Sequence, residues 1–387
     1  MHTSTLPLAR RGYTANDDPA EAARELHEQI HCEETALGIF FCSPRYDLNA
    51  LERELAARFG DVNLIGCTTA GEITPAGYRN DSISGVGFSS REFHAVTRRI
   101  ENLAGFEVGG GLEIAKSALA ELRGAVKDFR RENVFAMLLV DGLSLREESL
   151  VSTIYNSLGE IPLFGGSAGD GLEFGRTWIF HEGAFRANAA VLTLVHTSAP
   201  FSVFKTQHFI STDNKLVVTG ADSPLRVVYE LNGEPAADAY AQMVDVPVNA
   251  LDPTVFATHP VVVKIGGAYY VRSIQKMNED RSLSFYCAID EGIVLSLARG
   301  MDLVKDLHDL FRHVRDRVGE PRIVIGCDCI LRNLELDRRG IKDEVGRIMS
   351  ENHVIGFSTY GEQFNAMHVN QTFTGVAIGS KKEGDAE

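Results

Sequence analysis

The chain has 387 residues, of which 44% are hydrophobic and 24% charged, a composition that excludes a disordered chain, a fibre and a membrane bundle. Its 38 Lys and Arg residues against 53 Asp and Glu residues give a formal net charge of -15, without a basic block. Such a surface repels phosphate backbones and anionic lipids, so we expect neither nucleic acid nor a membrane surface as a partner.

The N-terminal residues 1–20 are polar and lack the apolar segment and cleavage pattern of a signal peptide, so we expect a flexible lead-in. The longest apolar runs, residues 135–140 and 189–195, are far shorter than the roughly 20 residues that cross a bilayer. Six cysteines in a chain of this length do not make a disulfide framework, so we expect reduced thiols. Together these features predict a cytoplasmic protein without membrane insertion.

A repeated pattern begins near residue 36. The first copy starts with an apolar run at residues 36–44, continues with helical periodicity over residues 48–59, and reaches a second apolar run that ends in the turn GCTTAGE. An alternating segment, ISGVGFSS, follows it. The second copy starts at residues 133–142, predicts a helix over residues 147–158, and ends in the turn GGSAGDG and a hairpin that turns near Glu182.

Between the second and third copies the pattern changes. Residues 201–222 predict two strands around a turn near Asp213 and Asn214, and a helix is predicted to begin near Pro235. Further strands and a helix with apolar residues from Leu303 to Val314 follow. At roughly 150 residues per domain, a chain of this length predicts about two to three domains. The predicted division is a lead-in at 1–20, an N-terminal domain at 21–200, a C-terminal domain at 201–380 and a polar tail at 381–387.

The third copy starts with the apolar run at residues 321–329, predicts a helix near residues 341–349, and ends in the turn GFSTYGE and the alternating segment HVNQTFTGVAIG. Each copy therefore predicts a strand, a helix, a strand, a small-residue turn and antiparallel strands. This order implies mixed sheets with packed helices, so the expected fold class is α/β. No G-x-G-x-x-G stands between a strand and a helix, which excludes a Rossmann fold.

The three turns bring hydroxyl groups and glycines to the carboxyl ends of buried strands, where open α/β sheets bind ligands. None has the lysine of a phosphate-binding loop, and each contains an acidic residue, so phosphate is not the expected ligand. The sequence leaves open whether the turns bind a ligand or only pack against a neighbouring sheet. The candidate residues are Cys67, Thr68, Thr69, Gly71, Glu72, Gly166, Ser167, Gly169, Asp170, Thr359, Tyr360, Gly361 and Glu362.

The three turns, the segments NGEPAADAY and AIDEG, and the closing HVNQTFTGVAIG resemble, in this order, the FIST proteins, bacterial sensory proteins with an N-terminal and a C-terminal FIST domain. The resemblance spans about residues 20–380. More narrowly, the sequence is similar to the NosP branch, FIST proteins that sense nitric oxide. The resemblance implies a sensor without enzymatic activity, which binds haem, takes nitric oxide at the iron and regulates a partner histidine kinase in cyclic-di-GMP and biofilm signalling.

If haem is bound, its iron needs a His, Cys, Met or Tyr ligand, with the other face open to the diatomic ligand. We rank His208 first, because it follows the apolar strand FSVF and precedes Phe209 in the inter-domain region, where a planar apolar ligand could be enclosed. His181, at the tip of a hairpin, and His368, near the last strand, are the next candidates for the cofactor site.

Other functions stay open. A haem-free FIST sensor would hold a small metabolite such as an amino acid in the turns, where Glu72 or Asp170 would favour a cationic group. Cys67, directly after an apolar strand, would be the nucleophile of a cysteine-dependent enzyme, although no base stands at a matched position. Cys327 and Cys329 would offer two of the roughly four ligands that zinc needs. The sequence also leaves a homo-oligomer open.

Overall fold

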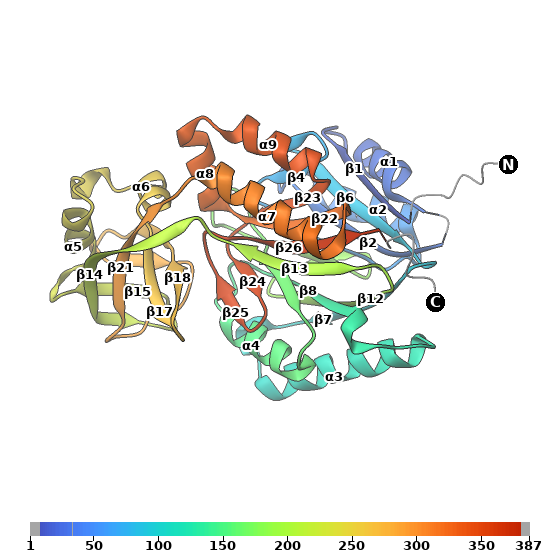
Figure 1. Cartoon of the computed structure of the whole chain (residues 1–387), viewed down its shortest axis with the longest axis horizontal. Helices are drawn as coiled ribbons and strands as arrows, with labels where there is room; N and C mark the ends of the chain where they lie inside the picture. The colour runs from blue at the N-terminus through green and yellow to red at the C-terminus, as the bar shows by residue number, and fades with distance from the viewer. Residues whose placement is uncertain (1–7, 33, 381–387) are drawn as a thin grey trace.

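The computed structural model of the chain describes residues 8–32 and 34–380, and it arranges them as a three-unit body with a smaller subdomain inserted in the third unit (Figure 1). The predicted α/β class is confirmed, since the described residues form three six-stranded sheets that mix parallel and antiparallel pairs under packed helices. A further, eight-stranded sheet belongs to the inserted subdomain.

The first unit follows the predicted order. Its elements are β1 (Ala9–Thr14), α1 (Pro19–Ile30), β2 (Thr35–Cys42), α2 (Leu48–Phe59), β3 (Leu64–Thr68), β4 (Glu72–Thr74), β5 (Gly77–Arg79) and β6 (Ile83–Ser89). β2 and β3 are parallel, and β6 returns antiparallel to β2. β1 pairs with β6, so residues 9–14 belong to the sheet and not to the flexible lead-in that we predicted at residues 1–20. Residues 1–7 of that segment lie outside the described residues.

The second and third units repeat this order. The second contains β7 (Phe93–Ile100), α3 (Val108–Ala125), β8 (Val134–Val140), α4 (Glu147–Leu158), β9 (Leu163–Ser167), β10 (Ile179–His181), β11 (Ala184–Arg186) and β12 (Ala190–Thr197). The third contains β13 (Phe201–Thr206), α7 (Leu303–Val318), β22 (Pro321–Cys329), α8 (Ile330–Arg339), α9 (Lys342–Glu351), β23 (Val354–Thr359), β24 (Glu362–Phe364), β25 (Met367–Val369) and β26 (Phe373–Gly379). The pattern predicted α9 but not α8.

Each sheet is completed by a hairpin from a neighbouring unit. The β10–β11 hairpin of the second unit pairs with β3 of the first, and the β24–β25 hairpin of the third pairs with β9 of the second. The β4–β5 hairpin of the first unit closes the cycle on β23 of the third. Because the exchange is cyclic, the three units are interlocked around a common pseudo-threefold axis.

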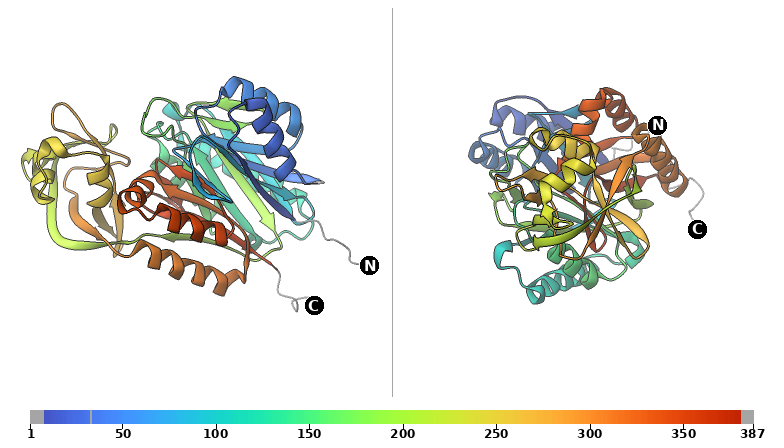
Figure 2. Two further views of the ribbon diagram at one scale, coloured as in Figure 1. Left: turned by 90° about the horizontal axis from the view of Figure 1, so that it is seen from above. Right: turned by 90° about the vertical axis from the view of Figure 1, so that its left-hand side faces the viewer.

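The central core lies between the inner faces of the three sheets. It is built from fully buried side chains of all three units, such as Phe41 and Phe357, whose rings stack with centroids 4.5 Å apart. The helices cover the outer faces, where each unit has a separate apolar layer (Figure 2). Burial of both faces of the parallel strands explains their continuous apolar runs in the sequence.

The glycine that starts each turn is required for close strand packing. A Cβ atom at Gly66, Gly165 or Gly356 would lie 2.6, 2.0 or 1.8 Å from a backbone oxygen of the neighbouring parallel strand. Such distances are well inside van der Waals contact, so a side chain at any of these positions would push the strands apart. The repeated glycine is therefore explained by sheet geometry, without a ligand.

The inserted subdomain lies at one end of the molecule, at the left of Figure 1. It contains β14 (Phe209–Asp222), β15 (Val227–Leu231), β16 (Glu234–Pro235), α5 (Ala236–Met243), α6 (Pro253–Thr258), β17 (Val261–Ile265), β18 (Ala268–Arg272), β19 (Ile274–Met277), β20 (Leu283–Phe285) and β21 (Val294–Gly300). The turn that we predicted at Asp213 and Asn214 is absent from β14, which runs through these residues with an irregularity in its pairing to β21. The two strands β13 and β14 are instead separated at residues 207–208.

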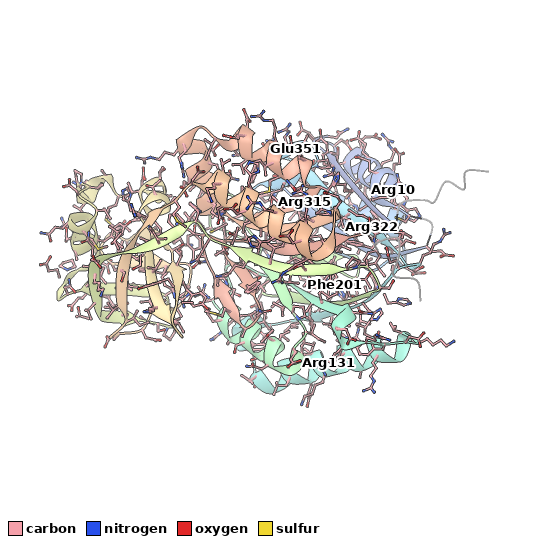
Figure 3. All side chains as sticks on the ribbon, viewed as in Figure 1. Arg10, Arg131, Phe201, Arg315, Arg322 and Glu351 are labelled. Atoms are coloured by element: carbon pink, nitrogen blue, oxygen red, sulfur yellow. The ribbon has the colours of Figure 1, made fainter. Side chains whose placement is uncertain are left out.

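Arginines on the body make contacts within the third unit and between this unit and its neighbour. Arg322, at the start of β22, forms an ion pair of 2.7 Å with Glu92 in the turn between β6 and β7. Arg315 of α7 donates a hydrogen bond of 2.7 Å to Asn352, and both arginines lie far from the inserted subdomain (Figure 3). Within residues 8–32 and 34–380, every helix is too short or too polar to span a bilayer.

Candidate functional site

The structure brings the three predicted turns together around the pseudo-threefold axis. In each contact, a backbone N–H of one turn donates to a backbone carbonyl of the next turn. The pairs are Gly169 to Thr68 at 3.0 Å, Tyr360 to Ser167 at 3.3 Å and Ala70 to Ser358 at 3.0 Å. The turns therefore contact one another directly, and these contacts leave open whether the turns also bind a ligand.

Two of the turns hold a buried glutamate in the same way. Glu72 accepts hydrogen bonds from the hydroxyl of Thr69 and from the backbone N–H and hydroxyl of Ser82. Glu362 accepts the equivalent bonds from Thr359 and Thr372. Burial raises the pKa of Glu72 to about 7 and that of Glu362 to about 8. At neutral pH, Glu362 is therefore mostly protonated, and the negative charge of Glu72 is reduced.

The second turn uses its acidic residue differently. Asp170 accepts hydrogen bonds from the backbone N–H groups of Phe174, Gly175 and Arg176, at 2.9, 2.7 and 2.7 Å. It also accepts a bond from the phenol of Tyr360 in the third turn. The carboxylate thus shapes its own loop, and few lone pairs remain for the cationic ligand group that we predicted for it.

A cavity of about 400 Å³ opens beside the first turn, between that turn, the loop at residues 170–173 and helix α8. Five carboxyl groups and two cationic groups line it, so its environment is acidic. The cationic groups, Arg45 and Lys342, pair with Asp81 and Asp337 at 2.5 and 3.0 Å. The lining residues are Ser43, Pro44, Arg45, Thr69, Ala70, Gly71, Glu72, Asn80, Asp81, Asp170, Gly171, Leu172, Glu173, Ile330, Asn333, Leu334, Asp337 and Lys342.

Asn333 is the polar lining residue with an unused buried atom. Its side chain is 6% exposed, and its Nδ2 donates a hydrogen bond of 2.9 Å to the hydroxyl of Ser358. Its Oδ1 is buried and has no hydrogen-bond partner among the described residues. A buried acceptor of this kind costs free energy unless a donor reaches it. Asn333 thus brings to the wall of the cavity one acceptor that a ligand N–H could satisfy.

His208, the first candidate for iron ligation, is enclosed by protein. It is 0% exposed, its Nδ1 accepts a hydrogen bond of 2.9 Å from Arg332, and its Nε2 lies 2.8 Å from the carboxylate of Glu335. Because arginine only donates, Nε2 carries the ring proton and donates to Glu335. Burial lowers the pKa of His208, which agrees with a neutral ring. With both nitrogens engaged, His208 does not fit an axial haem ligand.

The other two predicted histidines differ from each other. His368 is 3% exposed, and its ring nitrogens lie 3.3 Å from the carbonyl of Tyr286 and 3.5 Å from the amide of Gln363. The Nε2 of His181 lies 2.9 Å from the hydroxyl of Thr97, whereas its buried Nδ1 has no hydrogen-bond partner among the described residues. His181 borders a second cavity, of about 350 Å³, with Leu55, Phe59 and Phe180 among its lining residues.

The cysteines lie in packed surroundings. Cys67 and Cys327 are 0% exposed members of the central core, and burial raises the pKa of both thiols well above the usual value. These are the conditions of a packed thiol and the opposite of an activated thiolate. Cys329 is equally buried beside Tyr286 and Tyr360. Among the residues that the structure describes, no group of three or more His, Cys, Asp or Glu side chains could hold a metal ion.

The sequence identified Glu72 and the turns but missed Asn333 and the helix that carries it. α8 starts directly after β22 and has only ten residues, so its short periodic pattern is hard to detect. The signal that could have found it is the change from the apolar run of β22 to the segment ILRNLELDRR, which alternates apolar and charged residues at helical spacing.

Together, the fold and the site define a three-unit α/β protein with a small acidic cavity where its repeated turns meet. The model of the FIST N domain matches residues 36–234, and that of the FIST C domain matches residues 236–365. The chain therefore belongs to the FIST family, whose domains serve sensory signalling.

Two individual proteins are similar to this chain. The uncharacterized protein MJ1623 of Methanocaldococcus jannaschii is 24% identical over 360 residues, which cover 81% of this chain and 67% of the relative. A solved structure of cyanuric acid hydrolase aligns with 96% of this chain and 100% of its own, with 8% sequence identity and a TM-score of 0.35. The first relative is uncharacterized, and the second likeness is too weak to bear on function.

Proposed function

We propose that this FIST protein is a sensor that binds a small metabolite with an ammonium group, of the amino-acid class, in the cavity beside the first turn. The observation that carries the proposal is the buried Oδ1 of Asn333, a residue of the cavity wall, which has no hydrogen-bond partner in the part of the chain that the structure describes. An ammonium nitrogen has three donors and would satisfy this acceptor, which a carboxylate could not do.

The charges around the cavity support the same ligand class. Five acidic side chains line it against two basic ones, which favours a cationic group over an anion. Arg45 is exposed, and its ion pair with Asp81 is therefore weak. Arg45 can release Asp81 and pair with a ligand carboxylate at a low cost in free energy. A zwitterion would thus place its ammonium group at Asn333 and its carboxylate near Arg45 or Lys342.

A thermal-shift screen with the common amino acids and small amines tests the proposal. A ligand at 100 times its Kd stabilises the folded state by about 2.7 kcal/mol, a shift that such a screen detects. Asn333→Leu should lose the shift, and Asn333→Asp, which keeps the acceptor, should retain it. Asn352→Leu is the matched control, because Asn352 has the same 6% exposure but both of its polar atoms are paired away from the cavity. If no ligand shifts the wild-type protein, the proposal fails.

The second candidate function is the haem-based nitric oxide sensor that the resemblance implies. Of the three predicted histidines, His181 supports it best, since its Nδ1 has no hydrogen-bond partner among the described residues and the residue borders a cavity that Leu55, Phe59 and Phe180 line in part. His181 would hold the iron, and the haem would supply the binding site for nitric oxide. A saturable Soret band on hemin titration that shifts with nitric oxide and is lost in His181→Ala would support this function, and a broad, non-saturating spectrum would exclude it.

The recipient of the signal is the same in both proposals. We propose a separate histidine kinase, as the resemblance implies, whose autophosphorylation depends on the ligand state of this protein. The test is the autophosphorylation rate of a candidate kinase with the wild-type protein, with and without the ligand found in the screen. A rate that is equal in both conditions for every candidate would remove the kinase from the proposal.

A further inference from the structure

The pseudo-threefold symmetry creates a second copy of the site in the third unit. Thr359, Glu362 and Thr372 repeat the hydrogen bonds of Thr69, Glu72 and Ser82. The correspondence extends to an asparagine beside the turn. Asn80 lies against Gly71 in the first unit, and Asn370 lies against Gly361 in the third. The second unit has Ala187 at the matching position and lacks this amide.

The two copies of the site differ in how far they are open to solvent. The first copy is the open cavity with Asn80 at its edge. The inserted subdomain encloses the third-unit copy, where Gln371 donates a hydrogen bond of 3.3 Å to the backbone carbonyl of Phe256 in α6. Next to it, His368 lies 3.3 Å from the carbonyl of Tyr286, directly after β20. The third-unit copy is therefore buried at the junction of the body and the subdomain.

Polar atoms in this buried copy lack partners. Asn370 is 0% exposed, and neither its Oδ1 nor its Nδ2 has a hydrogen-bond partner among the described residues. The same holds for the Oε1 of Gln371, which is also 0% exposed, and for the Oε1 of the nearby Gln363. A buried amide without any partner is rare in folded proteins, because nothing replaces the hydrogen bonds that it made to water. A group with both donors and acceptors would satisfy these atoms.

The surroundings favour an uncharged group. Glu362 holds its proton at neutral pH, because burial raises its pKa to about 8, and burial also lowers the pKa of His368, so its ring is neutral. The nearby Arg226 pairs with both Glu147 and Glu148, at 2.6 and 2.5 Å, so one carboxylate charge is in excess beside the junction. This excess charge disfavours an anion there and leaves an uncharged polar group as the better match to the neutral Glu362 and His368.

We propose that the third-unit copy is a second binding site, which takes a small uncharged ligand with a carboxamide group, held by Asn370 and Gln371. A carboxamide presents one acceptor and two donors, which complement the donor and acceptor of Asn370 and the acceptor of Gln371. A ligand at this place contacts both the body and the inserted subdomain, so it holds the two parts together. This second site does not depend on the identity of the ligand in the first cavity.

The test uses acetamide, with acetate as the charged ligand of the same size. We expect acetamide at about 50 mM to raise the Tm of the wild-type protein by about 2 °C or more, and acetate to leave it unchanged. Asn370→Leu should lose the acetamide shift. Asn80→Leu, the same change at the symmetry-related position, should retain it while weakening the response to the amino acid of the first cavity. The two sites can therefore fail separately.

A crystal structure of the wild-type protein with acetamide keeps the test independent of the variants. Acetamide hydrogen-bonded to Asn370 in the crystal, together with the Tm shift in solution, supports the second site. Ordered water alone beside Asn370, acetamide in the crystal without a shift in solution, or an equal shift in Asn370→Leu overturns it.

Discussion

Replacing the two buried glutamates by glutamine, Glu72→Gln with Glu362→Gln, should remove a loss of stability at high pH. Burial raises the pKa of Glu72 from 4.5 to about 7 and that of Glu362 from 4.5 to about 8. In this range the folded chain keeps protons that the unfolded chain has released, so the stability falls as the pH rises from 4.5 through these values.

The size of the effect follows from the pKa change. A rise from 4.5 to about 7 corresponds to about 3 kcal/mol for Glu72 once the pH exceeds both values, and the contribution of Glu362 is larger. Glutamine imitates the protonated acid, since its amide can donate to the threonine hydroxyl and its oxygen can accept from the second hydroxyl. The double variant should therefore match the wild-type protein near pH 5 and exceed its stability near pH 8.

Urea unfolding across this pH range measures the effect. Buried His208 and His368 act in the opposite direction, because their lowered pKa values make stability rise with pH up to the usual histidine value of 6.5. These histidines are present in both proteins, so the difference between the two curves isolates the glutamates. Glu113→Gln on the exposed face of α3 is the control and should leave the curve unchanged. Parallel curves for the wild-type protein and the double variant would show that the two glutamates do not cause the loss of stability at high pH.

Four other substitutions test the packing and the buried polar contacts. Gly356→Ala should destabilise the fold by about 3 kcal/mol or more, because its Cβ would lie 1.8 Å from a carbonyl oxygen. Gly110→Ala, in open space on α3, should stabilise the fold by about 0.5–1 kcal/mol. Thermal unfolding measures both changes. Arg226→Ala should cost about 3–5 kcal/mol, since Glu147 is then buried without its cation, and an unchanged urea midpoint would contradict this. His208→Ala should lower the Tm without changing any hemin spectrum, and loss of a Soret band would show that the ring is available to iron.

The local elements could largely be predicted from the sequence. The apolar runs of β2, β8 and β22 belong to strands that are buried on both faces. Such runs can be recognised as strands without knowledge of the partner strands. The helical periodicity of α4 predicts its bounds, Glu147–Leu158, directly. The repeat of the three turns also predicts that they serve equivalent places in the fold. These features depend on residues that are close to one another along the chain, so the local sequence is enough to predict them.

The features that depend on distant residues could not be predicted. The cyclic exchange of hairpins joins strands that are far apart in the chain, such as β4 and β23, and no local pattern specifies such a pairing. His208 follows an apolar strand, which suggested a ligand pocket, but its environment is set by Arg332 and Glu335, more than 120 residues later. The sequence around Asn333 predicts only a helical residue, because its role depends on the first turn, which lies about 260 residues earlier in the chain and packs beside it in the fold.

A crystal structure of the protein with the amino acid that gives the largest thermal shift tests the proposed binding site. We expect the ligand in the cavity between the first turn and α8, with its ammonium nitrogen at hydrogen-bond distance from the Oδ1 of Asn333. A ligand bound elsewhere, or bound in this cavity with its ammonium group turned away from Asn333, would contradict it.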